Sequence, residues 1–129
     1  MKIEVATGEI VDKVSILQIK LEMVKDPAKL ANVAREYSIL IESMISMGIS
    51  EDSPEFRELK AVNLKIGNIE DRIRELEALQ EFGEEFIRCA RGVYHENDRR
   101  AVVKRRINLQ SGSSIVEEKE YTGYTRDTL

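Results

Sequence analysis

Tryptophan is absent from this sequence, proline occurs only twice, and Cys89 and His95 are the single cysteine and the single histidine. One cysteine cannot form an internal disulfide, so a disulfide-stapled domain is excluded. A zinc site made of cysteine and histidine is excluded as well, because it needs more of these ligands than the chain has. Cys89 and His95 are also not one helical turn apart, which argues against a nucleophile–base pair. We therefore expect neither a metal nor another cofactor.

Long apolar runs are also missing. The sequence shows no basic-then-apolar leader and no uncharged apolar stretch of membrane-spanning length. By elimination, we expect a cytoplasmic protein without a membrane span. The net charge is -4, whereas proteins that bind nucleic acid without sequence preference are usually basic. Any contact with RNA or DNA would therefore have to be local.

What the sequence does contain is typical of a helical protein. Charged residues make up 34% of the chain and aromatic residues only 5%, and leucine, glutamate, lysine and arginine lose little side-chain freedom in a helix. Apolar residues recur at spacings of three and four, which places them on one helical face. This periodicity predicts helices over residues 8–24, 27–48, 54–82 and from 84 onward. Because the connections are short, we predict an all-α protein, either an antiparallel helical bundle or long helical hairpins.

Residue types that cap helices mark several of these boundaries. Asp26 and Ser53 can accept hydrogen bonds from the free N–H groups at the start of a helix. Each is followed by a proline, Pro27 or Pro54, whose missing N–H has no cost at that position. Gly48 stands where a left-handed residue is expected to end the second helix.

Both ends of the chain are predicted to lie outside the helical core. The alternation in Lys2–Val5 indicates a short strand or an extended arm, with Thr7 as the cap of the first helix. Ser114–Tyr121 has a similar pattern and could pair with it as a second strand. We therefore divide the chain into a helical domain, residues 1–110, and an extended or disordered tail, residues 111–129.

The first predicted helix has apolar residues on two faces. The stripe from Ile10 to Val24 is sufficient for one core, while Ile16, Ile19 and Met23 form a second strip roughly opposite. A second apolar strip needs another surface to cover it. We therefore predict a homo-oligomer whose interface includes Ile16, Ile19 and Met23.

The segment 96–108, ENDRRAVVKRRIN, concentrates five arginines and lysines in an otherwise acidic chain. If one helix runs through it, the apolar face that begins at Phe82 becomes polar and basic halfway along. Buried or half-buried cations are unfavourable unless anionic or hydrogen-bonding groups face them. The side chains on this polar face are Asn97, Arg100, Lys104 and Asn108.

Three interpretations of this polar face remain open. Glu70 of the preceding helix could form an internal ion pair with Arg100 or Lys104 and determine the helix register. Alternatively, the four polar residues of the face bind a phosphate or carboxylate group. A helix break near Asn97-Asp98 would instead expose every cation of the segment.

Three blocks of the chain are TGEIVDKVSILQIKLEMV (7–24), FIRCARGVYHENDRRAVVKRRIN (86–108) and SGSSIVEEKEY (111–121). In these blocks the chain resembles a small family of uncharacterised all-helical bacterial proteins, often encoded near surface-polysaccharide genes. The resemblance covers most of the chain. It implies a bacterial, cytoplasmic and glycan-related protein, and it assigns no catalytic residues.

Two functions follow from these features. The first is a non-enzymatic interaction protein that self-associates and serves as an adaptor or accessory factor for an unknown protein partner, in surface-glycan metabolism as the resemblance implies. The alternative is a binding protein or accessory enzyme for a phosphate-bearing small molecule such as a nucleotide sugar, with Glu70 as the nearby candidate acid or base. A nucleic-acid contact is disfavoured, because aromatic residues do not alternate with the basic ones. Those basic residues are Arg99, Arg100, Lys104, Arg105 and Arg106.

Overall fold

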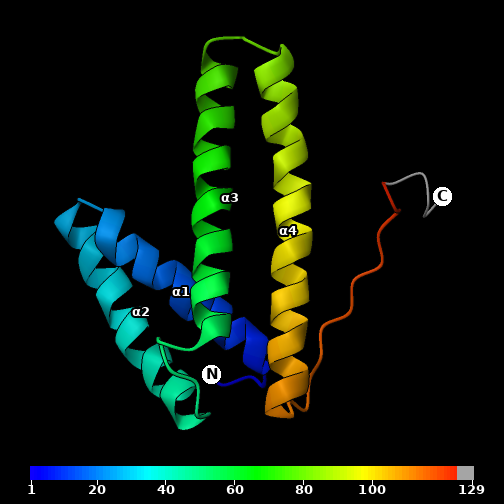
Figure 1. Ribbon diagram of the computed structural model, residues 1–129. Helices are drawn as coiled ribbons and strands as arrows, with labels where there is room; N and C mark the ends of the chain where they lie inside the picture. The colour runs from blue at the N-terminus through cyan, green and yellow to red at the C-terminus, as the bar shows by residue number, and fades with distance from the viewer. Residues whose placement is uncertain (125–129) are drawn as a thin grey trace.

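The computed structural model describes residues 1–124, and within them the protein is all-helical, as predicted. The helices are α1 (Thr7–Met23), α2 (Pro27–Ser46), α3 (Pro54–Ala78) and α4 (Glu84–Ser111). Helices α3 and α4 form a long antiparallel hairpin, and α1 and α2 form a shorter hairpin that crosses its lower end (Figure 1). Helix α1 packs against each of the other three helices and is therefore central to the fold.

The predicted starts of α2 and α3 are confirmed. The Asp26 carboxylate accepts a hydrogen bond of 2.9 Å from a backbone N–H in the first turn of α2, and the Ser53 hydroxyl accepts one of 3.2 Å in α3. Pro27 and Pro54 are the first helical residues. Gly48 adopts a φ of 78° just after α2, as expected for a left-handed residue that ends a helix.

The predicted cap of α1 is wrong. Thr7 is the first residue of the helix, and Ala6 before it provides no side-chain cap. The Thr7 N–H donates instead to the Ser113 hydroxyl at 3.1 Å. A residue from the opposite end of the chain therefore does what a local cap would do.

Helix α3 ends at Ala78, before the predicted end at Phe82-Gly83. Gln80 adopts a left-handed φ of 57°, and the Glu81 N–H donates to the Leu76 carbonyl at 2.9 Å. This is the Schellman arrangement that closes many helices, formed here without glycine. The earlier end lengthens the link to α4 and changes the register of the two helices.

Helix α4 runs without a break for 28 residues, so the predicted alternative of a break near Asn97-Asp98 is wrong. The Asn97 side-chain oxygen accepts a hydrogen bond from Arg100 Nη2 at 2.8 Å. Because that oxygen is used within the same helix, it does not cap a new one. The whole basic segment therefore lies on one continuous helix.

The apolar core lies where α1 crosses the α3/α4 hairpin. Its side chains come from all four helices, and none is more than 3% exposed. No helix in residues 1–124 combines the length and the apolar character needed to cross a bilayer. The core residues are Val11 and Val14 of α1, Met44 of α2, Phe56 and Leu59 of α3, and Val103 and Ile107 of α4.

The two chain ends meet, but not as strands. Within residues 1–124, neither Lys2–Val5 nor Ser114–Tyr121 forms a strand, and both lie outside the helices, as predicted. The ends are joined by side chains, because the Ser114 hydroxyl donates to the Glu4 carboxylate at 2.6 Å. Residues 113–124, called the C-terminal segment below, run alongside α4 (Figure 1). The domain division at residue 110 stays a prediction, and the last residues of the predicted tail, 125–129, lie outside the described part.

Helices α1 and α4 approach each other closely at Gly8. Its N–H donates to Asn108 Oδ1 at 2.6 Å. A Cβ atom placed on Gly8 would lie 2.6 Å from the Lys104 carbonyl oxygen and 2.9 Å from Asn108 Oδ1. Since the first of these atoms belongs to the backbone, a side chain here would force the helices apart.

We predict that Gly8→Ala lowers the free energy of unfolding by about 1–3 kcal/mol through overpacking. Gly67→Ala is the matched control, because nothing lies within 4 Å of a Cβ at that position of α3. The control should raise stability by about 0.5–1 kcal/mol, the ordinary helix preference for alanine. Urea unfolding of both variants measures the difference. Stabilisation by both substitutions would contradict the close contact at Gly8.

Candidate functional site

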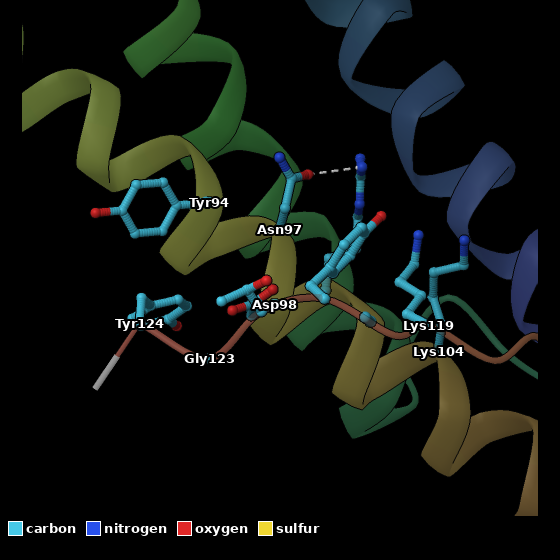
Figure 2. Close-up of a pocket in the computed structure, with 11 residues that line it drawn as sticks. Tyr94, Asn97, Asp98, Lys104, Lys119, Gly123 and Tyr124 are labelled. Carbon is cyan, nitrogen blue, oxygen red and sulfur yellow. Dashed lines mark hydrogen bonds between the residues drawn. The ribbon is translucent and has the colours of Figure 1, made fainter. Parts of the chain in front are cut away.

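A pocket of about 710 Å³ lies between α4 and the C-terminal segment. Helix α4 contributes Tyr94, Asn97, Arg100 and Lys104, whose spacing of three and four places them on one face. Lys104 and Lys119 lie at one end of the pocket, and Tyr94, Asp98 and Tyr124 lie at the other (Figure 2). The C-terminal segment contributes Lys119, Tyr121 and Tyr124.

Arg100 is held in this pocket by two neutral amides. Its Nη1 donates to Asn63 Oδ1 of α3 at 3.2 Å, and its Nη2 donates to Asn97 Oδ1 at 2.8 Å, the bond drawn in Figure 2. Among residues 1–124, no carboxylate forms an ion pair with Arg100. The guanidinium group also carries more N–H donors than these two bonds use. Its charge is thus available to a bound anion.

The amide of Asn63 belongs to a buried polar layer between α1 and α3. Its Nδ2 donates to Asp12 Oδ1 at 2.8 Å and to Ser15 Oγ at 2.9 Å. Asp12 and Asn63 are 5% and 7% exposed, and Ser15 is fully buried. The layer therefore connects a buried carboxylate of α1 to Arg100 through one amide.

Lys104, in contrast, is surrounded by carboxylates. Its Nζ lies 2.8 Å from Glu9, 3.6 Å from Glu117 and 3.8 Å from Asp12. Its side chain is only 14% exposed. Lys104 therefore joins α4 to α1 and to the C-terminal segment.

Glu117 bridges Lys104 and Lys119, the two lysines of the pocket. Its distance to Lys119 Nζ is 2.9 Å. The hydrogen bond from Lys119, together with the charge of Lys104, lowers the pKa of Glu117. The same hydrogen bond raises the pKa of Lys119. An anion that binds these lysines has to compete with Glu117.

The opposite end of the pocket is aromatic. The ring centroid of Tyr124 lies 5.1 Å from that of Tyr94 and 4.7 Å from that of His95. The Asp98 carboxylate beside the Tyr124 phenol raises the pKa of that phenol. Tyr94 and Tyr124 remain 41% and 49% exposed. Their rings therefore offer open surface to a planar group.

The structure brings together Asn97, Arg100 and Lys104 of the predicted anion site. It places Asn108 elsewhere, because that side chain is 2% exposed and its oxygen accepts the hydrogen bond from Gly8. Sequence reasoning missed Lys119 and the tyrosines. Tyr94 could have been found from its spacing to Asn97, whereas residues 111–129 are predicted as a tail separate from the helical domain.

The predicted ion pair of Glu70 with Arg100 or Lys104 is not formed in residues 1–124, where Glu70 is exposed. The reason is the register of α3 and α4. Ile69 lies against Gly92, about two turns before Arg100 in α4, so Glu70 is too far along the hairpin. Asn63 occupies the level of Arg100 instead.

The remaining cations of segment 96–108 are paired with carboxylates. Arg99 lies 3.3 Å from Glu96, and the other pairs join α4 to different parts of the fold. A surface that binds nucleic acid needs cations that are free to contact phosphates, so this pairing argues against that role. The other pairs are Arg105 with Glu118 and Arg106 with Glu58.

The described residues show no arrangement typical of a metal centre. In residues 1–124, no three His, Cys, Asp or Glu side chains are grouped as they would be around a metal ion. His95 packs with Tyr94 and Tyr124, and Cys89 is partly buried. The chemistry that the pocket residues support is the binding of an anion beside aromatic rings.

We predict that Glu9→Gln lowers the free energy of unfolding by about 1 kcal/mol, because Lys104 loses its nearest charged partner. Glu70→Gln removes the same charge from an exposed position and should change stability by less than about 0.5 kcal/mol. Urea unfolding at neutral pH compares the two variants. A larger loss for Glu70→Gln would show that the predicted pairing with Glu70 exists in solution.

No curated protein and no solved structure matches this chain. The sequence model of a family described as a family of unknown function (DUF6165) matches residues 1–127. Since this match spans nearly the whole chain, the protein belongs to that family.

Proposed function

We propose that this protein binds a phosphate-bearing small molecule in the pocket between α4 and the C-terminal segment. The observation that carries the proposal is the state of Arg100, a partly buried cation whose hydrogen-bond partners are both neutral. A cation taken out of water without a carboxylate partner is unfavourable in the free protein. A bound phosphate supplies the missing negative charge, and guanidinium groups bind phosphate especially well.

The pocket also favours a ligand with a planar ring. Its volume, about 710 Å³, lies within the usual range for sites that bind small molecules. The cations at one end suit a phosphate, and the exposed aromatic side chains of Tyr94 and Tyr124 suit a ring packed at the other. A nucleotide sugar has both parts. The cytoplasmic location and the glycan-related role, expected from the sequence, accompany this proposal and remain predictions.

The test is the thermal stability of the wild type and of Arg100→Met in increasing inorganic phosphate or UDP-glucose. A ligand that binds only the folded state stabilises it by about 2.7 kcal/mol at about 100 times its Kd. The melting temperature of the wild type should therefore rise, and Arg100→Met should lose most of this rise. Arg91→Met is the control, because it removes the same charge from an exposed position of the same helix.

Glu117→Gln should have the opposite effect to Arg100→Met on phosphate binding. It removes the carboxylate that competes for Lys104 and Lys119, so phosphate should bind more tightly than in the wild type. Sodium chloride at equal ionic strength controls for screening, and uncharged glucose controls for the sugar. The proposal is abandoned if phosphate and UDP-glucose both leave the wild-type melting temperature unchanged.

We also propose, as a second role, that the protein self-associates and thereby serves as an interaction protein. The observation in its favour is on α1, where Met23 is 54% exposed and Ile16 and Ile19 are only partly buried. Partial exposure of three neighbouring apolar side chains leaves surface for a second copy to cover. Because α1 packs on three helices, part of this strip is already covered within the chain.

Sedimentation over a dilution series should reveal a dimer or larger species. Met23→Glu should shift it toward monomer, because a charge buried within an apolar contact is unfavourable. Leu64→Glu, at a 41% exposed position of α3, is the control and should have no effect. The combined change Ile16→Glu and Ile19→Glu should weaken association further. A monomer at every wild-type concentration would exclude this role.

A further inference from the structure

Arg100 and Asp12 have opposite charges and both bond to Asn63, yet no ion pair joins them in residues 1–124. Asn63 lies between them, bonded to Asp12 through Nδ2 at 2.8 Å and to Arg100 through Oδ1 at 3.2 Å. A second amide, that of Asn97, holds the other arm of the guanidinium group at 2.8 Å. The positive charge is thus positioned by amides and separated by Asn63 from the Asp12 carboxylate.

We propose that Asn63 and Asn97 are positioning residues that hold Arg100 without neutralising it, and that the order Asp12, Asn63, Arg100 makes the pocket selective for anions. This inference rests on the proposed function. It adds that the selectivity is determined behind the pocket, in the layer between α1 and α3.

The orientation of the Asn63 amide follows from its neighbours. A guanidinium group only donates hydrogen bonds, and a carboxylate only accepts them. The oxygen of Asn63 therefore faces Arg100, and its nitrogen faces Asp12 and Ser15. Asp12 thereby orients the amide that positions Arg100, and the negative end of the amide dipole points toward the cation.

If the layer served stability alone, a direct ion pair between Arg100 and Asp12 would be sufficient. Arginine and aspartate in contact form two parallel charge-assisted hydrogen bonds, which are stronger than bonds from arginine to amides. Such a pair would also cancel the charge that a ligand needs, because the interaction of opposite charges increases as their distance falls. The amide spacer gives weaker bonds but keeps the charge available to the pocket.

The experiment exchanges the two buried side chains. The double variant D12N/N63D keeps the net charge and nearly the same shapes, and it moves the carboxylate into contact with Arg100. The amide then lies behind the carboxylate and no longer separates it from the guanidinium group. Lys104 loses Asp12 but keeps Glu9 at 2.8 Å. We expect the Kd for inorganic phosphate, measured by titration calorimetry, to rise about tenfold or more.

The melting temperature of the double variant without phosphate is the second measurement. A merely structural role for the layer would lower stability and leave the phosphate affinity of the folded protein unchanged. The proposal expects weaker binding by a protein that is still folded at the temperature of the titration. Adding Arg100→Met to the double variant should then weaken binding no further.

The substitution Asn97→Asp places a carboxylate beside Arg100 on the pocket side and leaves the buried layer unchanged. It should also weaken phosphate binding about tenfold, by providing a carboxylate partner for Nη2. Asn68→Asp is the matched control, because it adds the same charge at an exposed position of α3. If the double variant does not fold, the comparison of Asn97→Asp with Asn68→Asp tests the role of the amides by itself.

The outcomes separate the two proposals. If the wild type binds phosphate and both Asn97→Asp and a folded double variant bind it equally well, the amide spacer is wrong and the proposed function stands. If the wild type binds neither phosphate nor UDP-glucose, the proposed function fails and this inference fails with it. Weaker phosphate binding by Asn97→Asp, with the binding of Asn68→Asp unchanged, supports both proposals.

Discussion

The close contact between α1 and α4 at Gly8 governs the geometry of the polar interior. Because glycine has no side chain, its N–H reaches Asn108 Oδ1 at 2.6 Å, and the two helix backbones almost touch. One turn further along α1, Asp12 then reaches Asn63. A larger residue at position 8 would separate the helices, because packed interiors leave little space for an added group. The position of Arg100 depends on this contact through Asp12 and Asn63.

The packing of other elements against α4 explains why an acidic chain concentrates cations in segment 96–108. The carboxylates that pair with them come from α1, α3, α4 and the C-terminal segment, so the basic side of α4 joins separate parts of the fold. Exposed ion pairs contribute little stability each, and their main effect here is to position elements. Arg100 differs from its neighbours because its partners are amides. A concentration of charge in the sequence thus contains several cations paired with carboxylates and, in Arg100, one that is bonded to amides instead.

The candidate site could be predicted only in part. Asn97, Arg100 and Lys104 lie on one helix, and their common face follows from helical periodicity. Asn108 belongs to the same predicted face, but its partner is Gly8, which is distant in sequence. Glu70 was the wrong partner because its level beside α4 depends on where α3 ends. That end is closed at Gln80 by a left-handed residue that is not glycine, for which composition gives little signal.

The sequence by itself determined the all-helical class and the boundaries at Asp26-Pro27, Ser53-Pro54 and Gly48, because the interactions that end or start these helices are made within a few residues. Tertiary structure decided the start of α1, where Ser113 replaces a local cap, and the partners of Arg100. It also placed the C-terminal segment along α4 as a wall of the pocket. These features depend on distances between residues far apart in the chain, and local patterns contain no information about such distances.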